Sequence, residues 1–272
     1  MKSPQTQEVD ILNVDQISKT IEQSEPDFVI NFAAYTDVQE AEKQKDDKEG
    51  ICYKVNAQGA KNVADVCKDN RIHLIHISTD YVFDGNKDGS PYTEEDKSNP
   101  VNWYGMTKHF GDQFVLESGC PSTIVRISMP YTAHYEAKLD VARFFLSELR
   151  NGNKIEAIKD QRITPTFVDD ISTALRVLIE KEEKGIYHVA SIDYTSAFDF
   201  ANLLAKTFEL ESSLIEQISL EEYNKNKLAK ILRFSWLNPA KFVGEFGDGV
   251  LHTIEDSLKL FKQAGSNRQL TA

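Results

Sequence analysis

The segment DFVINFAA, residues 27–34, has the pattern of a buried β-strand that ends in small residues. A helix is expected over 50–70, where apolar residues recur at helical spacing, and HLIHIST (73–79) is expected to form a second strand. Farther along the chain, the pattern predicts a helix over 102–118 and a third strand over 123–128. Strands and helices that alternate in this order predict a parallel sheet covered by helices.

The second half of the chain has a more mixed pattern. Amphipathic helices are expected at 141–150, 169–184 and 196–210, a strand at 185–191, and a last short helix at 253–263. No internal repeat or low-complexity tract interrupts the pattern. The sequence therefore predicts an α/β protein throughout.

Composition and charge exclude several classes of protein. The chain has 272 residues, of which 40% are hydrophobic and 27% charged, as in ordinary globular domains. Its 31 basic and 43 acidic side chains give a formal net charge of −12, which argues against a nucleic-acid partner. The three cysteines, an odd number without CxxC spacing, predict reduced thiols and no metal site. No apolar run approaches the length of a membrane span, so we expect a cytoplasmic protein without a membrane partner.

The start of the chain departs from the usual nucleotide-binding pattern. A doubly wound nucleotide-binding domain opens with a strand, a glycine-rich turn and a helix. Here the first clear strand is 27–34, and neither GxGxxG nor GxxGxxG occurs. Either the fold is not of the Rossmann type, or the first βαβ unit, about 30 residues or more, is missing.

The clearest chemical motif is Tyr104-Gly-Met-Thr-Lys108, a YxxxK on a predicted helix. Residues four apart lie on one helix face, so the phenol and the ammonium can reach one cavity. A nearby ammonium is expected to lower the pKa of the tyrosine, which is ordinarily about 10, and such a tyrosine can protonate an alkoxide during carbonyl reduction. On its own, the motif also fits a tyrosine and a lysine on a helix surface.

Two further segments carry polar or small residues at the ends of predicted strands. Thr79 and Asp80 follow the 73–79 strand, at the edge where open α/β sheets bind ligands, although Thr79 also fits a strand-end cap. Ala33 and Ala34 end the first strand and would let a dinucleotide approach the backbone. A tightly packed turn is the structural alternative for these alanines.

Six segments together resemble the dTDP-4-dehydrorhamnose reductases, which are extended short-chain dehydrogenases/reductases. The order and spacing are typical of that family, and the resemblance covers about 9–191, more faintly to 263. The segments are VINFAAYTDVQEAE, YKVNAQGAKNVA, HISTDYVFDG, NPVNWYGMTKHFGD, TPTFVDDIS and GIYHVAS. The resemblance implies a Rossmann-like doubly wound sheet with a smaller C-terminal substrate domain. It also implies reduction of the 4-keto group of a nucleotide-linked deoxysugar by NADPH or NADH.

The resemblance also implies roles for individual residues. Tyr104 matches the proton donor, Lys108 the lysine that tunes it and binds the nicotinamide ribose, and Thr79 the hydroxyl that orients the substrate. Asp80 and Met129 match substrate-binding positions. The cofactor-binding positions are matched by Asp10, Ile11, Ala33, Ala34 and Tyr35, together with Tyr104 and Lys108. Asn56 matches a helix asparagine for which a structural role is equally expected, and Arg126 is expected in a core strand without a catalytic role.

Two departures from the family pattern stand out. The glycine-rich turn, which supplies backbone N–H groups for the pyrophosphate, is not found, so we expect an N-terminally shortened chain, most simply one with an incomplete start. The family usually has an aromatic residue near Met129, and a methionine cannot stack on a sugar in the same way.

The predicted domains follow from the resemblance. A dinucleotide-binding domain is expected over 1–130 plus about 162–191, a substrate domain over 131–161 and 192–265, and a loose tail over 266–272. The main alternative function is a non-catalytic binding subunit of the same fold, like the regulatory subunit of methionine adenosyltransferase. A related epimerase or dehydratase is a third alternative, disfavoured because no Glu follows Thr79 and Asp80. The expected partner is a nucleotide-sugar, and a homodimer remains open.

Overall fold

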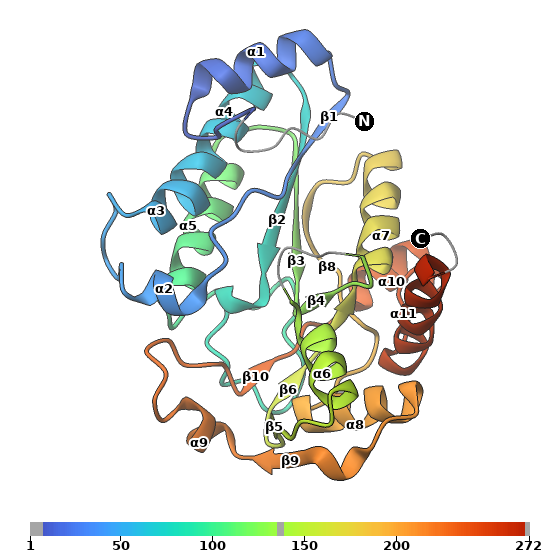
Figure 1. Ribbon diagram of the computed structural model, residues 1–272. Coiled ribbons are helices and arrows are strands. Elements are labelled where there is room, and N and C mark those ends of the chain that lie inside the picture. The colour runs from blue at the N-terminus through green and yellow to red at the C-terminus, as the bar shows by residue number, and fades with distance from the viewer. Residues whose placement is uncertain (1–7, 135–138, 270–272) are drawn as a thin grey trace. The chain divides into compact units, whose positions relative to one another are not determined.

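The chain divides into two compact units in the computed structural model, which describes residues 8–134 and 139–269, with side chains described as far as Ser266 (Figure 1). Unit 1 comprises Met1–Asp84, Lys97–Arg126 and Leu178–Tyr187, and unit 2 comprises Gly85–Asp96, Ile127–Val177 and His188–Ala272. No helix within the described residues is both long and apolar enough to cross a membrane.

Unit 1 is built on a four-stranded sheet in the order β1-β2-β3-β8. β1 forms an edge of this sheet and pairs in parallel with β2, in a register that places Phe28 opposite His73. The strands are β1 (Phe28–Asn31), β2 (His73–Thr79), β3 (Ser122–Ile127) and β8 (Gly185–His188). The predicted α/β class with a parallel sheet is confirmed.

Helices cover this sheet because their apolar faces are buried in the core that they form with it. α1 is capped by Asn13, whose side chain accepts a hydrogen bond from the Gln16 N–H, and it buries Ile17 and Ile21 four residues apart. These two isoleucines join the core that α4 and β2 form around Leu74. The helices and short helical turns of unit 1 are α1 (Val14–Ser24), α2 (Val38–Glu42), α3 (Ile51–Tyr53), η1 (Lys54–Gly59), α4 (Ala60–Asp69), η2 (Asp80–Val82) and α5 (Trp103–Glu117).

The predicted helix over 50–70 is interrupted by a π-helical stretch. η1 lies between α3 and α4 without a break in the helical path, and it contains the buried Asn56. α5 packs closely on it, because a Cβ added at Gly111 would come within 2.3 Å of the Asn56 backbone oxygen. Single π-helical turns inside α-helices often mark functional positions.

Unit 2 combines helices with several two-stranded pairs. Its largest core surrounds the buried rings of Tyr131, Phe167, Phe200 and Phe261. The strand pairs are β4·β7, β5·β9 and β6·β10, all parallel. The elements are β4 (Pro130–Tyr131), α6 (Val141–Arg150), β5 (Ile155–Ile158), β6 (Arg162–Ile163), β7 (Thr166–Phe167), α7 (Val168–Glu180, which continues into unit 1), α8 (Ala197–Phe208), η3 (Ser212–Leu214), β9 (Ile215–Ile218), α9 (Leu220–Asn224), β10 (Phe234–Ser235), α10 (Ala240–Phe246) and α11 (Ile254–Gln269).

The division of the chain differs from the predicted domains in four segments, 85–96, 127–130, 162–177 and 188–191, all of which belong to unit 2. Residues 85–96 belong to unit 2, because Tyr92 exchanges backbone hydrogen bonds with Trp236 and Asn238. Residues 162–177 also belong to unit 2, because β6 and β7 pair with strands of that unit. The predicted start of the tail at 266 is wrong as well, since α11 continues to Gln269; residues 270–272 lie outside the described part.

Candidate active site

Polar side chains gather where β2 ends. The Thr79 hydroxyl accepts a hydrogen bond from the Tyr81 N–H at 3.3 Å and so caps the short helical turn η2. The same hydroxyl donates to the Asp80 carboxylate at 2.9 Å. Thr79 and Asp80 are both buried. The strand-end cap considered for Thr79 is therefore present, and it fixes the hydroxyl in one position.

The first turn of α5 is held by three contacts. Asn102 caps it by accepting from the Gly105 N–H at 2.8 Å, and the Glu42 carboxylate accepts from the Trp103 N–H at 2.7 Å. Gly105 packs against η2, since a Cβ added there would come within 2.1 Å of the Tyr81 backbone oxygen. These contacts fix the position of the first turn of α5 and therefore the position of the Tyr104 side chain.

Tyr104 lies beside the residues that end β2. Its ring meets that of Tyr81 edge to face, with 5.7 Å between centroids, and its phenol hydrogen-bonds with Thr79. Burial raises the pKa of Tyr104 above its usual value, the Thr79 bond opposes this rise, and the nearby Asp80 adds to it. The predicted lowering by an adjacent ammonium is wrong here, because burial raises the pKa and Lys108 is not among the groups that shift it.

Lys108 lies one helical turn beyond Tyr104 and is almost fully buried, at 2% exposed. Its ammonium donates to the backbone oxygen of Ile77 in β2 at 2.7 Å. Burial lowers the pKa of Lys108 to about 8, while the carboxylate of Asp112 counteracts this by favouring the charged form. The lysine therefore titrates close to neutral pH, as a group with a chemical role often does.

Three buried polar residues near Lys108 were not identified from the sequence. Asp112, His76 and Ser78 form a buried polar cluster with Arg126, whose placement in a core strand is confirmed. The Ser78 hydroxyl donates to Asp112 at 2.8 Å. Asp112 could have been identified from the sequence, because it lies four residues after Lys108 and therefore on the same face of the helix.

The loop after β1 is pinned by side chains. Asn31 accepts a hydrogen bond from the Ala33 N–H at 3.1 Å, and the buried Asn56 accepts from the Tyr35 N–H at 2.8 Å. Ala33 is exposed, and Ala34 and Tyr35 are half-buried. The two small residues thus lie on an accessible surface with a fixed backbone.

Asn56 connects this loop to α5. Its amide nitrogen donates to the backbone oxygen of Tyr35 at 3.1 Å and to the Thr107 hydroxyl at 3.0 Å. The Thr107 hydroxyl in turn donates to the Tyr104 backbone oxygen at 2.9 Å. Asn56 therefore has a structural role, which was one of the two roles expected for it.

Replacing Asn56 by Ala is expected to lower the free energy of unfolding by roughly 2–4 kcal/mol, because it leaves buried polar groups without partners. Denaturant unfolding measures this. Asn202→Ala is the control: Asn202 lies on α8 and its amide donates only locally, to the Phe198 backbone oxygen. Equal losses in the two variants would contradict the connecting role of Asn56.

Asp10 and Ile11 lie before α1 and are both half-buried. The Asp10 carboxylate accepts a hydrogen bond from the Leu12 N–H at 2.9 Å. Ile11 packs against η1, where a Cβ added at Gly59 would come within 2.4 Å of its side chain. Both predicted cofactor contacts thus belong to unit 1, as do the residues around Tyr104.

Met129 belongs to unit 2, whereas the other candidate residues belong to unit 1. It lies between β3 and β4 with a φ of 40°, in the left-handed region that a residue other than glycine seldom adopts. Its side chain packs on Ile158 and Ile163. The predicted contact of Met129 with the sugar stays a prediction.

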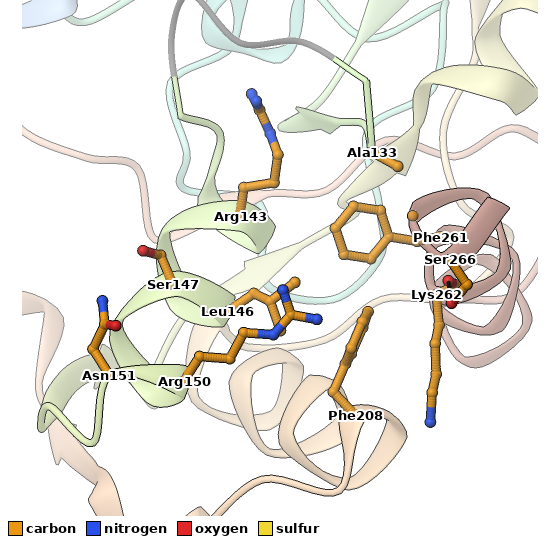
Figure 2. Close-up of a pocket in the computed structure, with 11 residues that line it drawn as sticks. Ala133, Arg143, Leu146, Ser147, Arg150, Asn151, Phe208, Phe261, Lys262 and Ser266 are labelled. Atoms are coloured by element: carbon orange, nitrogen blue, oxygen red, sulfur yellow. Dashed lines mark hydrogen bonds between the residues drawn. The ribbon is translucent and has the colours of Figure 1, made fainter. Parts of the chain in front are cut away.

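A cavity of about 500 Å³ in unit 2 contains none of the predicted site residues. It lies among α6, α8 and α11, and Figure 2 shows Arg143, Arg150 and Lys262 pointing in different directions around it. Arg143 pairs with Asp140 at 2.7 Å, and Lys262 with Glu209 at 3.0 Å. Because the cations do not converge, the cavity offers no assembled anion site. Among the described residues, no group of three His, Cys, Asp or Glu side chains could hold a metal.

Comparison with known proteins identifies the family. The model of the RmlD substrate binding domain matches residues 1–261. A probable low-salt glycan biosynthesis reductase of Haloferax volcanii is 30% identical over 96% of this chain and 85% of its own length. A dTDP-4-dehydrorhamnose reductase of Mycobacterium tuberculosis is 31% identical over 72% of this chain and 64% of its own.

A solved structure shares the fold. The dTDP-4-dehydrorhamnose reductase of Bacillus anthracis, solved in complex with NADP, superimposes with a TM-score of 0.87. It is 29% identical, and the match covers 96% of this chain and 88% of that one. The predicted Rossmann-like fold and the resemblance carried by the six segments are confirmed: the chain belongs to the RmlD substrate binding domain family.

Proposed function

We propose that this protein reduces the 4-keto group of a nucleotide-linked deoxysugar, as a dTDP-4-dehydrorhamnose reductase does, with NADPH or NADH as the hydride source. The single observation that carries the proposal is the meeting of Thr79, Tyr104 and Lys108 at the end of β2. Hydroxyl, phenol and ammonium in one partly buried place suit the reduction of a carbonyl group.

The proposed chemistry assigns one task to each of these side chains. Tyr104 keeps its proton at neutral pH, because its pKa is raised, and donates it to the oxygen of the ketone as negative charge develops there. Thr79 is proposed to turn its hydroxyl proton from Asp80, to which it donates in this structure, to that oxygen and so to orient it. The ammonium of Lys108 stabilises the phenolate that Tyr104 becomes.

A dinucleotide fits the residues that surround this group. NADPH or NADH supplies the hydride when bound. Ala33 and Ala34 offer a surface without bulky side chains, and Asn31 and Asn56 fix the backbone beside it. Asp10 and Ile11 are accessible in the same unit and are proposed to contact the adenine end.

The alternative of a non-catalytic binding subunit is less well supported. The relatives described above carry the names of reductases, and the sequence has the three side chains to which the chemistry is assigned here, Thr79, Tyr104 and Lys108. The burial of the Lys108 ammonium beside the end of β2, where it donates to the Ile77 backbone oxygen, also suits a reactive site. Turnover separates the two: an enzyme consumes NADPH or NADH in the presence of dTDP-4-dehydrorhamnose, whereas a binding subunit does not.

Replacing Lys108 by Met is expected to slow ketone reduction by about 100-fold or more, because the phenolate of Tyr104 loses its neighbouring cation. The measurement is the initial rate of NADPH consumption with dTDP-4-dehydrorhamnose. Lys61→Met is the matched control, since Lys61 lies on the surface of α4 and pairs only with Asp65 across one helical turn. A Lys108→Met variant as fast as the wild type would refute the assigned role.

A further inference from the structure

Three chemically active side chains follow one another along α5. Tyr104, Lys108 and Asp112 are spaced by four residues each and therefore lie along one face of the helix. Lys108 and Asp112 are buried, at 2% and 1% exposed. The proposed function uses the first two groups and leaves the buried carboxylate without a task.

Burial disfavours the charged form of Asp112, and its polar neighbours partly offset this effect. Its carboxylate accepts a hydrogen bond from the Ser78 hydroxyl at 2.8 Å, and Arg126 and Lys108 add positive charge nearby. Burial raises the pKa of Asp112 above its usual value, and these three groups oppose that rise without cancelling it. His76, 3.7 Å away, is itself held neutral because burial and Lys108 lower its pKa.

Asp112 is not simply the structural partner of Arg126. Their closest approach, between the arginine Nε and a carboxylate oxygen, is 3.7 Å, which exceeds the roughly 2.8 Å of a closed arginine–carboxylate pair. The guanidinium instead donates to Ser98 at 3.2 Å and lies over the ring of Phe83. Asp112 is therefore not closed into a pair with Arg126, and the buried Lys108 lies one helical turn before it on the same face of α5.

Several groups decide whether Lys108 is charged. Among the described residues, Asp112 is the strongest influence that favours the ammonium, and Cys52 of α3 adds a weaker one. His76 of β2 and His109 of α5 also face the pair, and burial lowers the pKa of both. The charge of Lys108 therefore depends chiefly on one carboxylate.

We infer that Asp112 is a positioning residue for the reaction, whose carboxylate keeps Lys108 in its ammonium form beside the Ile77 carbonyl, one turn from Tyr104. The inference rests on the proposed function, since it gives Lys108 the task described above. Asp112 itself touches neither substrate nor hydride source, and it acts only through the lysine.

This role has a consequence for the dependence of the rate on pH. The active form has a charged Lys108, so the rate falls as pH rises through the pKa of that lysine, near 8 in the wild type. The phenol of Tyr104 titrates above this range. Without the carboxylate, the lysine loses its proton at lower pH. The alkaline limb of the pH profile, which is the fall in rate at high pH, therefore moves to lower pH.

The test is the pH profile of kcat for Asp112→Asn, measured with saturating NADPH and dTDP-4-dehydrorhamnose. The alkaline limb is expected to move down by about one pH unit. Asp112→Glu, which restores the charge, should return the limb to its wild-type position even if the longer side chain costs stability. A limb that stays in place in Asp112→Asn would overturn the inference.

A matched control removes another buried aspartate. Asp170 in unit 2 accepts hydrogen bonds from the ring and backbone nitrogens of His252, and Asp170→Asn should cost stability without moving the limb. If Asp112→Asn does not fold, Ser78→Ala replaces it. This variant removes the hydrogen bond that favours the Asp112 carboxylate, so the limb should move in the same direction by less, and an unmoved limb would then count against the inference.

Failure of the proposed function would look different. If the wild type reduces no ketone at any pH, the proposed function is wrong and the task of Asp112 falls with it. If the wild type turns over and loses activity on Tyr104→Phe, while the limb of Asp112→Asn is unmoved, only the inference about Asp112 fails.

Discussion

Tyr104→Phe should lower kcat for ketone reduction by about 10²–10⁴-fold, because it removes the one hydroxyl that can protonate the developing alkoxide. The phenyl ring keeps its edge-to-face contact with Tyr81, so the fold should be retained. The loss of the hydrogen bond with Thr79 should change the free energy of unfolding by about 1 kcal/mol. Initial rates and a denaturant unfolding curve measure the two effects.

Tyr53→Phe is the control for this substitution. Tyr53 belongs to the same aromatic cluster and stacks on Trp103 with 6.4 Å between ring centroids. It is assigned no role in the chemistry, so its hydroxyl should be dispensable for the rate. If Tyr104→Phe and Tyr53→Phe both kept the wild-type rate, the assignment of Tyr104 as proton donor would be wrong.

Gly105→Ala is expected to lower the free energy of unfolding by roughly 3 kcal/mol and to slow ketone reduction as well. The added methyl would come within 2.1 Å of the Tyr81 backbone oxygen, so α5 must move away from η2. That movement displaces the adjacent Tyr104 from Thr79, and small displacements of a reacting group are costly in rate. Denaturant unfolding and kcat report the two losses.

Gly244→Ala separates this clash from the general effect of adding a methyl group to a helix. Gly244 lies in α10, and a Cβ added there would meet no atom within 4 Å. Alanine is favoured over glycine in a helix, so this variant should be as stable as the wild type or more stable by up to about 1 kcal/mol. Equal destabilisation of the two variants would show that the close approach to Tyr81 is unimportant.

Long apolar patterns made the sheet of unit 1 predictable from sequence. β2, which is buried almost throughout, has the predicted bounds, and α5 begins and ends one residue inside the predicted range, with Asn102 as its N-cap. α1 was not predicted, since its buried face consists of only Ile17 and Ile21 in a polar segment. Two of the strand pairs of unit 2, β4 with β7 and β6 with β10, are only two residues long and carry no period.

The candidate site was predictable where it depends on spacing within one helix. Tyr104 and Lys108 could be found because four residues make one turn, and Thr79 because it ends a buried strand. Asp112 continues the same spacing, but a carboxylate on a helix is usually exposed, and its burial follows from packing against β2. The predicted lowering of the Tyr104 pKa was wrong for a related reason, because the sequence does not show how far a side chain is removed from water.

Transfer of deuterium tests the central claim most directly. The protein is incubated with dTDP-4-dehydrorhamnose and with NADPH or NADH deuterated at the transferring position of the nicotinamide, and the sugar product is examined by mass spectrometry and NMR. One deuterium is expected on C4 of the reduced sugar, and in the same incubation time Tyr104→Phe should form at least about 100-fold less of this product. A wild-type protein that leaves the 4-keto sugar unreduced with both deuterated nucleotides would contradict the central claim.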